Sequence, residues 1–502
     1  MTPRGRAADR IVGATCALAP VSIRRVATGA RREATTRMAR LRTGASGVRL
    51  RRSARIWRLT ARNAWRLAAH RARRRLSSDA DRTALDDAFA MRTAEDVARE
   101  LGNMKGALMK AGQLLSFIVE ALPEPAQQAL SSLYSDAPPM SSELAAGVVR
   151  DEFGSPPERV FLDWAAVPVA AASVGQVHRA VTRHGQDVAV KVQYPGVADA
   201  IEADLANAEG LYRLFSAMAM KGLDTKALVN ELRLRMREEL DYRIEARNID
   251  EFRSHFADHP FVSMPALVPE HSGRRVLTTE WVDGLSWTEF RDVATPAALR
   301  HAGESIWRFA QHAILRVGAF NGDPHPGNYK FSRDGDVTFL DFGLVKRWSP
   351  GEWELLRPSM EAIILHRDPE LLVTSMQASG FLRAGHGLDP QAVYDYVSTP
   401  YRPYLSDTFT FTREFMKDTV SRIMDVNGPH AEVIERLNMP TSFVILDRVV
   451  WGISALLGKF ELTAPWRAML LEYLEDADPA TPLGWQELEW RRTTLSKRDG
   501  TT

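Results

Sequence analysis

The stretch NGDPHPGN at residues 321–328, followed by VTFLDFG at residues 337–343, decides the class of fold. Asp323 and Asn328 stand five residues apart, as in the D-x-x-x-x-N catalytic loop of kinases, and Asp341 opens an Asp-Phe-Gly triplet after a strand-like run. Phosphoryl transfer needs a carboxylate beside the acceptor oxygen and hard oxygen ligands on the Mg²⁺ that bridges the phosphates. The spacing therefore predicts a kinase-like site in which Asp323 positions or deprotonates the acceptor, and Asn328 and Asp341 bind Mg²⁺.

A lysine that fits this site lies upstream, in VAVK at residues 188–191. The pattern is close to V-A-I-K, in which a strand holds an ammonium group over the α- and β-phosphates of ATP. We expect Lys191 to play this part and a helix carboxylate to pair with it. The long charged helix predicted over residues 226–252 offers Glu231, Glu238 and Glu239, and spacing alone does not choose among them.

The glycine-rich phosphate loop of ordinary kinases is missing. Its place before the lysine strand is taken by PVAAASVGQVHRA at residues 168–180. Alanine carries a Cβ, so it adopts positive φ less freely than glycine and keeps the backbone farther from a phosphate. We expect Ala171, Ala172 and Ser173 to face the nucleotide, which should sit differently from ATP in an ordinary kinase.

Five motifs follow one another between residues 95 and 345, about half of the chain. They are KAGQ at 110–113, SVGQVHRA at 173–180, VKVQYPGV at 190–197, ELDY at 239–242 and DPHPGN at 323–328. Together they resemble the UbiB/AarF (ADCK) family of atypical protein-kinase-like proteins. One position departs from the family pattern, because Asn321 stands where histidine is frequent.

The resemblance implies an α+β, two-lobed protein-kinase-like fold, with a small β-rich N-lobe, a helical C-lobe and an added N-terminal KxGQ helical extension. It also implies binding of ATP or ADP with Mg²⁺. The KxGQ helix, which carries Lys110 and Gln113, would fold across the nucleotide cleft, and the ExD pair Glu239 and Asp241 would face it. Family members support isoprenoid quinone biosynthesis, typically of ubiquinone, and lipid homeostasis, through ATPase activity more than protein phosphorylation.

Composition limits the classes of protein to which the chain can belong. Its 502 residues are 45% hydrophobic and 25% charged, with one cysteine, Cys16. These values exclude a disordered or disulfide-stapled protein and indicate a reducing compartment. Residues 1–80 contain 21 arginines, no lysine and three acidic residues, a net charge of +18, whereas the remainder carries 44 basic and 60 acidic residues, a net charge of −16. A basic arm therefore precedes an acidic body.

The segment 48–76 has helical spacing of apolar residues with arginines between them, which is typical of a helix on an anionic membrane surface or of one packed on the protein with a solvated arginine face. No run of 18 uncharged apolar residues occurs, so we expect no transmembrane span. We therefore expect a cytoplasmic protein with peripheral membrane association through this helix, and no nucleic-acid partner.

The predicted organisation has five parts. They are a basic arm with an amphipathic helix (1–80), the KxGQ helical extension (81–140), the N-lobe (141–285), the C-lobe (286–480) and a tail (481–502). Hairpins are predicted at residues 174–192 and 329–340, strands around Val262 and over 275–281, and helices through most of the C-lobe.

The sequence favours a Mg²⁺-dependent ATPase or small-molecule phosphotransferase acting beside isoprenoid lipid or quinone metabolism, with an isoprenoid lipid or quinone precursor as partner. One alternative is a kinase of small hydroxylated molecules of the aminoglycoside-kinase type. Another is a nucleotide-gated lipid-binding scaffold that keeps the metal ligands for binding alone.

Overall fold

The structure is a computed structural model that describes residues 140–172, 174–198, 225–425, 428–438 and 441–499. Several predicted features lie outside these ranges: the basic helix at 48–76, the KxGQ extension with Lys110 and Gln113, and Ser173 in the alanine-rich loop. All the described residues belong to one compact unit of the chain.

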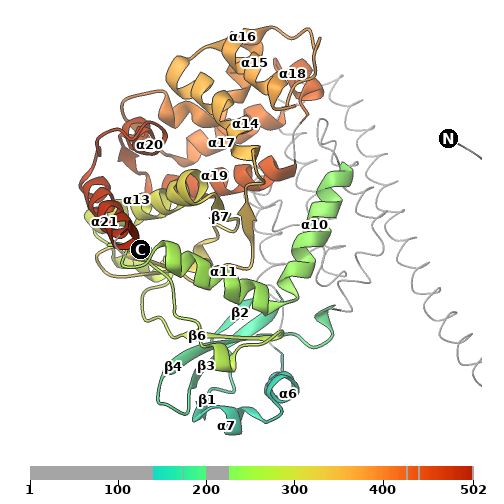
Figure 1. Ribbon diagram of the computed structural model, residues 1–502, viewed down its shortest axis with the longest axis vertical. Coiled ribbons are helices and arrows are strands. Elements are labelled where there is room, and N and C mark those ends of the chain that lie inside the picture. The colour runs from blue at the N-terminus through green and yellow to red at the C-terminus, as the bar shows by residue number, and fades with distance from the viewer. Residues whose placement is uncertain (1–139, 173, 199–224, 426–427, 439–440, 500–502) are drawn as a thin grey trace, which may run out of the picture. The chain divides into compact units, whose positions relative to one another are not determined.

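A five-stranded antiparallel sheet forms the smaller lobe (Figure 1). Its strand order is β1-β3-β4-β6, and the short β2 also pairs with β3. The strands and helices up to the end of this lobe are α6 (Ser142–Phe153), α7 (Pro157–Val160), β1 (Asp163–Trp164), β2 (Ala170–Ala172), β3 (Gly175–Val181), β4 (Asp187–Gln193), α10 (Thr225–Glu239), α11 (Tyr242–His255), β5 (Val262–Ser263), the 3₁₀ turn η1 (Pro269–His271) and β6 (Val276–Glu280). The predicted hairpin at 174–192 is confirmed as β3 and β4, which pair from Gly175 with Gln193 to Val181 with Asp187.

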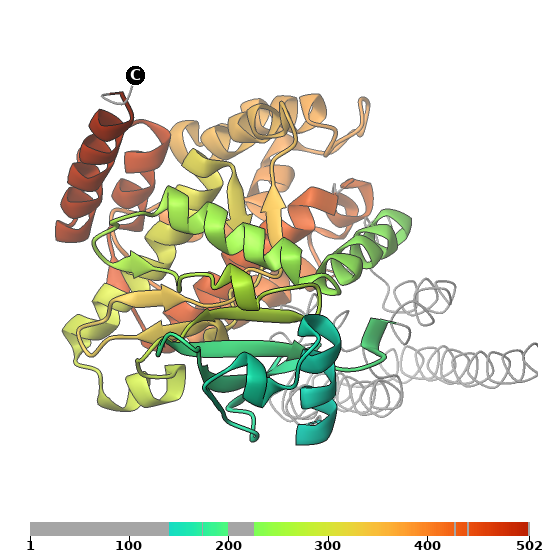
Figure 2. The same ribbon diagram turned by 60° about the horizontal axis from the view of Figure 1, so that its bottom comes forward.

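The alternation of side chains along β4 places the lysine. Val188, Val190 and Val192 are fully buried in a small core to which α6 contributes Ala145 and Val149. Helix α6 lies across this face of the sheet (Figure 2). Because successive residues of a strand point to opposite faces, Lys191 projects from the other face, away from α6.

The predicted helix over 226–252 is wrong as a single helix. It is broken into α10 and α11 at Asp241, which has φ −130° and ψ 93°. The carboxylate of Asp241 accepts a hydrogen bond from the backbone N–H of Arg243 at 3.1 Å and caps α11. An N-cap aspartate satisfies a helix N–H that would otherwise lack a partner, so it favours a new helix start over continuation. Helix α11 then runs beside the sheet and contacts β6 (Figure 1).

The larger lobe is mainly helical, with short strands around the predicted catalytic loop. Its elements are α12 (Trp287–Val293), α13 (Pro296–His312), η2 (Ala313–Val317), β7 (Ala319–Asn321), η3 (Pro326–Asn328), β8 (Tyr329–Phe331), β9 (Val337–Phe339), β10 (Val345–Arg347), α14 (Glu352–Glu361), η4 (Ala362–His366), α15 (Pro369–Ala378), α16 (Pro390–Val397), η5 (Thr399–Tyr404), β11 (Phe409–Thr410), α17 (Arg413–Met424), α18 (Ala431–Arg436), α19 (Thr441–Phe460), β12 (Thr463–Ala464), α20 (Trp466–Leu474) and α21 (Pro482–Asp499). The predicted hairpin at 329–340 is confirmed as β8 and β9, and β5 adds to it in parallel.

The hydrophobic core of this lobe lies between the short strands and helix α13. Trp307 of α13 is 1% exposed, and the ring of Phe309 stacks on Phe339 of β9 with centroids 3.9 Å apart. Helix α19 packs on the same helix α13. The loops at the ends of β7 and β9, which carry the site, are therefore mounted on buried elements.

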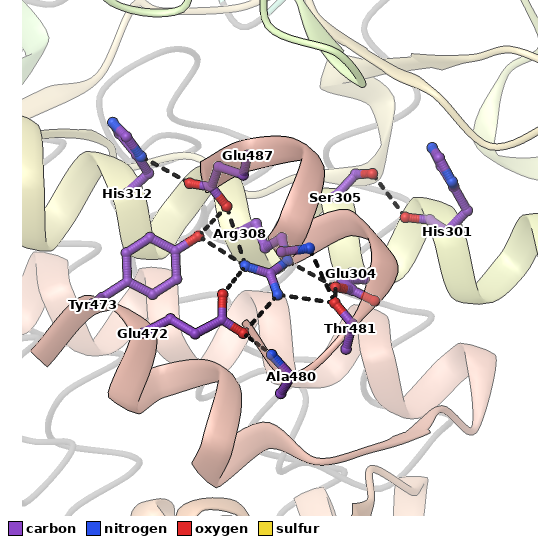
Figure 3. A network of polar contacts seen from close by, with 11 residues as sticks. His301, Glu304, Ser305, Arg308, His312, Glu472, Tyr473, Ala480, Thr481 and Glu487 are labelled. Carbon is purple, nitrogen blue, oxygen red and sulfur yellow. Dashed lines mark hydrogen bonds and ion pairs between the residues drawn. The ribbon is translucent and has the colours of Figure 1, made fainter. Parts of the chain in front are cut away.

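A buried polar network ties the C-terminal helices to α13 (Figure 3). The guanidinium of Arg308, whose side chain is 1% exposed, donates to Glu472 at 2.7 and 3.0 Å, to Glu487 at 3.1 Å and to Glu304 at 2.7 Å. His312, one turn further along α13, contacts the other oxygen of Glu487 at 2.9 Å. Residues 481–502 were assigned to a tail, but most of this segment is the packed helix α21, which supplies Glu487.

No helix in the described part of the chain is long and apolar enough to cross a membrane.

Candidate functional site

Asn321, at the end of β7, joins the two loops that carry the predicted catalytic and metal-binding residues. Its side-chain Oδ1 accepts a hydrogen bond from the backbone N–H of Asp323 at 2.9 Å. Its Nδ2 donates to the backbone carbonyl of Asp341 at 2.7 Å. Asn321 is buried, 8% exposed, so these bonds are shielded from water. Asn321, which stands where the UbiB/AarF pattern frequently has histidine, therefore ties the backbone at Asp323 to the backbone at Asp341.

Asp323 is held through both carboxylate oxygens. Nδ2 of Asn328 donates to its Oδ2 at 3.1 Å and to its backbone carbonyl at 3.1 Å. Its Oδ1 forms an ion pair with Arg448, which lies on α19. Since the amide nitrogen of Asn328 is engaged, its amide oxygen is the atom of this residue that can bind a cation. The hydrogen bond between Asn328 and Asp323 and the ion pair with Arg448 are contacts that the structure adds to the predicted spacing. Arg448 was not singled out from the sequence.

Lys191 lies between two carboxylates in a largely buried site. Its Nζ is 2.8 and 3.0 Å from the two oxygens of Glu245 and 3.0 Å from Oδ2 of Asp341. The side chain of Lys191 is 14% exposed, that of Glu245 is 5% exposed and that of Asp341 is 30% exposed. Burial alone would lower the pKa of Lys191, but the charges of Asp341 and Glu245 outweigh burial and raise the pKa well above its ordinary value. The lysine is therefore a permanent cation.

The predicted partners of Lys191 were wrong, because the carboxylate that pairs with it is Glu245. Glu238 pairs with Arg235 at 2.7 Å, Glu239 precedes the break between the helices, and the side chain of Glu231 lies outside the described residues. The break at Asp241 starts a new helix, and Glu245 lies in its first turn. An aspartate before an apolar residue is a helix-start signal, so the pattern DYRIE contained the information needed to place Glu245.

The negative charge of this triad exceeds its positive charge, because one ammonium faces two carboxylates. Burial raises the pKa of Glu245 to about 7, with Lys191 acting in the opposite direction and Asp341 in the same direction. An added cation next to Asp341 would relieve this excess. The charges of the triad are therefore compatible with the metal ion that the sequence predicts beside Asp341.

The Asp-Phe-Gly loop is fixed from both sides. Oδ1 of Asp341 accepts a hydrogen bond from the backbone N–H of Gly343 at 2.9 Å, and Nδ2 of Asn248 donates to the carbonyl of Phe342 at 2.9 Å. Phe342 is fully buried, with its ring 4.8 Å from that of Phe252. Asn248 and Phe252 follow Glu245 along α11, so this one helix positions both the partner of Lys191 and the Asp-Phe-Gly loop.

The alanine-rich segment forms the short strand β2, which pairs with β3 of the five-stranded sheet. Ala171 and Ala172 lie on β2, opposite Gln176 and Gly175 of β3, and Ser173 lies outside the described residues. Gly175 permits a close approach, because a Cβ there would lie 2.3 Å from the carbonyl oxygen of Val192 and 2.8 Å from the hydroxyl of Tyr242. The contact of Ala171 and Ala172 with a nucleotide remains a prediction.

The Glu239 and Asp241 pair lies at the junction of α10 and α11. Glu239 is 6% exposed. Asp241 caps α11, and hydrogen bonds from Arg243 lower its pKa. In the structure, Asp241 therefore starts the helix that carries Glu245. Because Lys110 and Gln113 lie outside the described residues, the predicted facing of the two motifs remains a prediction.

The donors present fit a magnesium ion that is bound largely through a nucleotide. Within the described ranges, no three His, Cys, Asp or Glu side chains come together as a metal cage. The amide oxygen of Asn328 and the carboxylate of Asp341 remain, and both are hard oxygen ligands. Mg²⁺ typically takes one or two such protein ligands together with phosphate oxygens and water.

A strand lysine in an ion pair with a helix glutamate, an Asp–Asn catalytic loop and an Asp-Phe-Gly loop together define a kinase-like protein. The sequence profile described as the ABC1 atypical kinase-like domain matches residues 132–376. The chain belongs to this family, whose other names are UbiB and AarF.

Relatives share this region. The Arabidopsis thaliana protein ACTIVITY OF BC1 COMPLEX KINASE 1, chloroplastic, is 33% identical over 59% of this chain and 44% of its own length. An aarF domain-containing protein kinase of the same plant, described as uncharacterised and chloroplastic, is 33% identical over 80% of this chain and 56% of its own. The chain thus spans about half the length of these relatives. The Mycobacterium tuberculosis protein Rv3197, solved in complex with erythromycin, is 30% identical, with a TM-score of 0.56 over 76% of this chain and 95% of the other. The predicted kinase-like fold is confirmed.

Proposed function

We propose that the chain binds ATP and ADP with Mg²⁺ and acts as an ATPase or as a phosphotransferase to a hydroxyl acceptor. The observation that carries this proposal is the ion-paired triad of Lys191 with Glu245 and Asp341, which Asn321 joins by hydrogen bonds to the loop of Asp323 and Asn328. In kinases the lysine–glutamate pair and the Asp-Phe-Gly aspartate must both be in place for transfer.

Each residue of the site has a distinct part in this proposal. Lys191 holds the α- and β-phosphates, and Glu245 orients the ammonium. The amide oxygen of Asn328 and the carboxylate of Asp341 hold Mg²⁺, which neutralises charge on the phosphates when it is bound. Asp323 accepts the proton of the attacking hydroxyl or water, and the hydrogen bond from Asn328 orients its carboxylate.

The biological setting proposed is support of isoprenoid quinone biosynthesis of the ubiquinone type, or of lipid homeostasis, with an isoprenoid lipid or quinone precursor as partner. The family resemblance supports this setting. The +18 charge of residues 1–80 supports a cytoplasmic protein held at an anionic membrane surface. Because Rv3197 was solved with erythromycin, binding of that compound should be measured alongside binding of isoprenoid lipids and quinone precursors.

The test measures ATP turnover and ADP binding separately on the purified full-length chain, with and without anionic vesicles. Asp323→Asn should lower turnover by about 10²–10⁴-fold, since it removes a general base, and should leave binding of MgADP nearly unchanged. Asp334→Asn, in the exposed turn between β8 and β9, is the matched control. Turnover in Asp323→Asn equal to that of the control would contradict the assigned part of Asp323.

Two alternatives predict other results in the same assay. A nucleotide-gated scaffold would bind MgADP without turnover by the wild type. A small-molecule kinase of the aminoglycoside-kinase type would show turnover that depends on a hydroxylated small molecule and does not respond to vesicles.

A further inference from the structure

One face of α19 follows the catalytic loop residue by residue. A Cβ at Gly322 would lie 3.1 Å from Cγ2 of Ile445, and a Cβ at Gly452 would lie 2.4 Å from Cγ of Pro324. Between these two contacts, Arg448 forms its ion pair with Asp323. Positions 445, 448 and 452 are three and four residues apart, so they share one face of the helix. Helix α19 therefore packs directly on the loop that carries Asp323.

The guanidinium of Arg448 has more donors than the ion pair uses. Its side chain is 6% exposed, and one nitrogen, Nη2, contacts Asp323. Its Nε and Nη1 are buried and find no hydrogen-bond partner within the described residues. Buried N–H groups of a charged side chain that lack acceptors are costly, and native proteins usually supply an acceptor for them. These donors therefore point to a ligand that carries an anionic oxygen.

We propose that Arg448 is the anion-binding residue of the acceptor site. While no acceptor is bound, Arg448 pairs with Asp323. When an anionic hydroxyl acceptor binds, Arg448 contacts its phosphate or carboxylate group. This inference rests on the proposed function and names its substrate class. Guanidinium groups bind both kinds of oxyanion through charge-assisted hydrogen bonds.

Binding of the anionic group changes the state of Asp323. Its Oδ1 is paired with Arg448 and its Oδ2 accepts from Asn328, so an acceptor hydroxyl must compete for the carboxylate. An oxyanion that shares the guanidinium weakens the hold on Oδ1. The hydroxyl proton then passes to Oδ1 as the acceptor oxygen bonds to the γ-phosphorus, the bond from that phosphorus to the bridging oxygen breaks, and ADP leaves.

The experiment measures thermal stabilisation and calorimetric binding of three probes, glycerol 3-phosphate, glycerate and glycerol, to the full-length chain. MgADP is present at saturation, so that the nucleotide's own phosphate sites are filled. Glycerol 3-phosphate or glycerate should bind the wild type, and glycerol should not. Arg448→Gln should weaken binding of the anionic probe by about tenfold or more, and Arg448→Lys should weaken it less, because it keeps the charge and loses the planar fork. Arg422→Gln, an exposed arginine on α17, should bind as the wild type does.

Two results would overturn the proposal: equal affinity of the wild type and both Arg448 variants for the anionic probes, or no binding of either probe to the wild type up to about 50 mM. MgADP binding by each variant reports that it is folded, and Arg448→Lys serves if Arg448→Gln does not fold. Failure of the wild type to bind MgADP would refute the proposed nucleotide function itself, so the two failures are distinguishable.

Discussion

Replacing Arg308 by methionine should cost far more stability than replacing an exposed arginine. The change removes one cation and leaves the carboxylates of Glu304, Glu472 and Glu487 facing one another, with side chains 14%, 3% and 2% exposed. Breaking a buried ion pair by removal of one partner costs about 3–5 kcal/mol, because the remaining charge stays buried without compensation. We therefore expect the free energy of unfolding of Arg308→Met to fall by about 3–5 kcal/mol.

Urea unfolding followed by tryptophan fluorescence measures this loss. In a chain of several hundred residues each kcal/mol lowers the Tm by about 1–2 °C, because the entropy of unfolding grows by about 2 cal/mol/K per residue. A loss of about 3–5 kcal/mol should therefore lower the Tm in a thermal melt by about 3–10 °C. Arg422→Gln is the matched control, since its pair with Asp418 is exposed and worth about 0–1 kcal/mol. The double variant Arg308→Met/Glu472→Gln should recover part of the loss. A loss for Arg308→Met no larger than for the control would refute the reasoning.

Three further changes test other parts of the structure. Burial raises the pKa of Asp447 to about 7, and a hydrogen bond with Trp451 acts in the opposite direction. The folded state therefore binds more protons than the unfolded state between about pH 4 and 7. The free energy of unfolding falls as the pH rises through that window. Asp447→Asn should therefore gain up to about 4 kcal/mol over the wild type at pH 8 and little at pH 4, because a shift of about three pKa units is worth about 1.4 kcal/mol per unit. Urea unfolding that gave the same difference at both pH values would contradict this. Ala172→Gly frees φ beside the turn between β2 and β3 and should change the ratio of ATP to ADP affinity, whereas an unchanged ratio in titration calorimetry would show that this segment does not set it. A final variant replaces the arginines at positions 51, 52, 55, 58, 62 and 66 by glutamine in the full-length chain. It should co-sediment less with anionic vesicles at low salt, because each arginine near such a surface contributes about 1 kcal/mol. Pelleting equal to that of the wild type would favour the interpretation that this predicted helix packs on the protein.

The elements that local patterns specify were predictable from the sequence. Alternating valines define β4 and so place Lys191 on the face away from α6. The spacing of Asp323 and Asn328 singled out the loop between β7 and β8, in which the structure joins the two side chains by a hydrogen bond. The break between α10 and α11 was missed, because charged helical residues continue on both sides of it and a single capping aspartate decides it. That error led directly to the wrong partners for Lys191.

Contacts between distant parts of the chain were beyond prediction for a different reason. Arg448 lies 125 residues after Asp323, on a helix whose own pattern shows only an apolar face with a few charges. Asn248 likewise reads as a polar residue of an amphipathic helix until Phe342 packs beside it. A lone arginine or asparagine carries no local signal for its partner, so tertiary packing alone reveals these contacts.

The measurement that tests the account most directly is titration calorimetry of ADP against the wild type, Asp341→Asn and Asp334→Asn, each with Mg²⁺ and with the metal removed by chelation. The account predicts that removing Mg²⁺ weakens ADP binding to the wild type and to Asp334→Asn by about tenfold or more. Asp341→Asn should bind ADP weakly and with the same affinity in both conditions, because a carboxylate ligand of a hard cation is gone. Binding of ADP to Asp341→Asn that matches the wild type in affinity and in dependence on Mg²⁺ would contradict the assignment of the site.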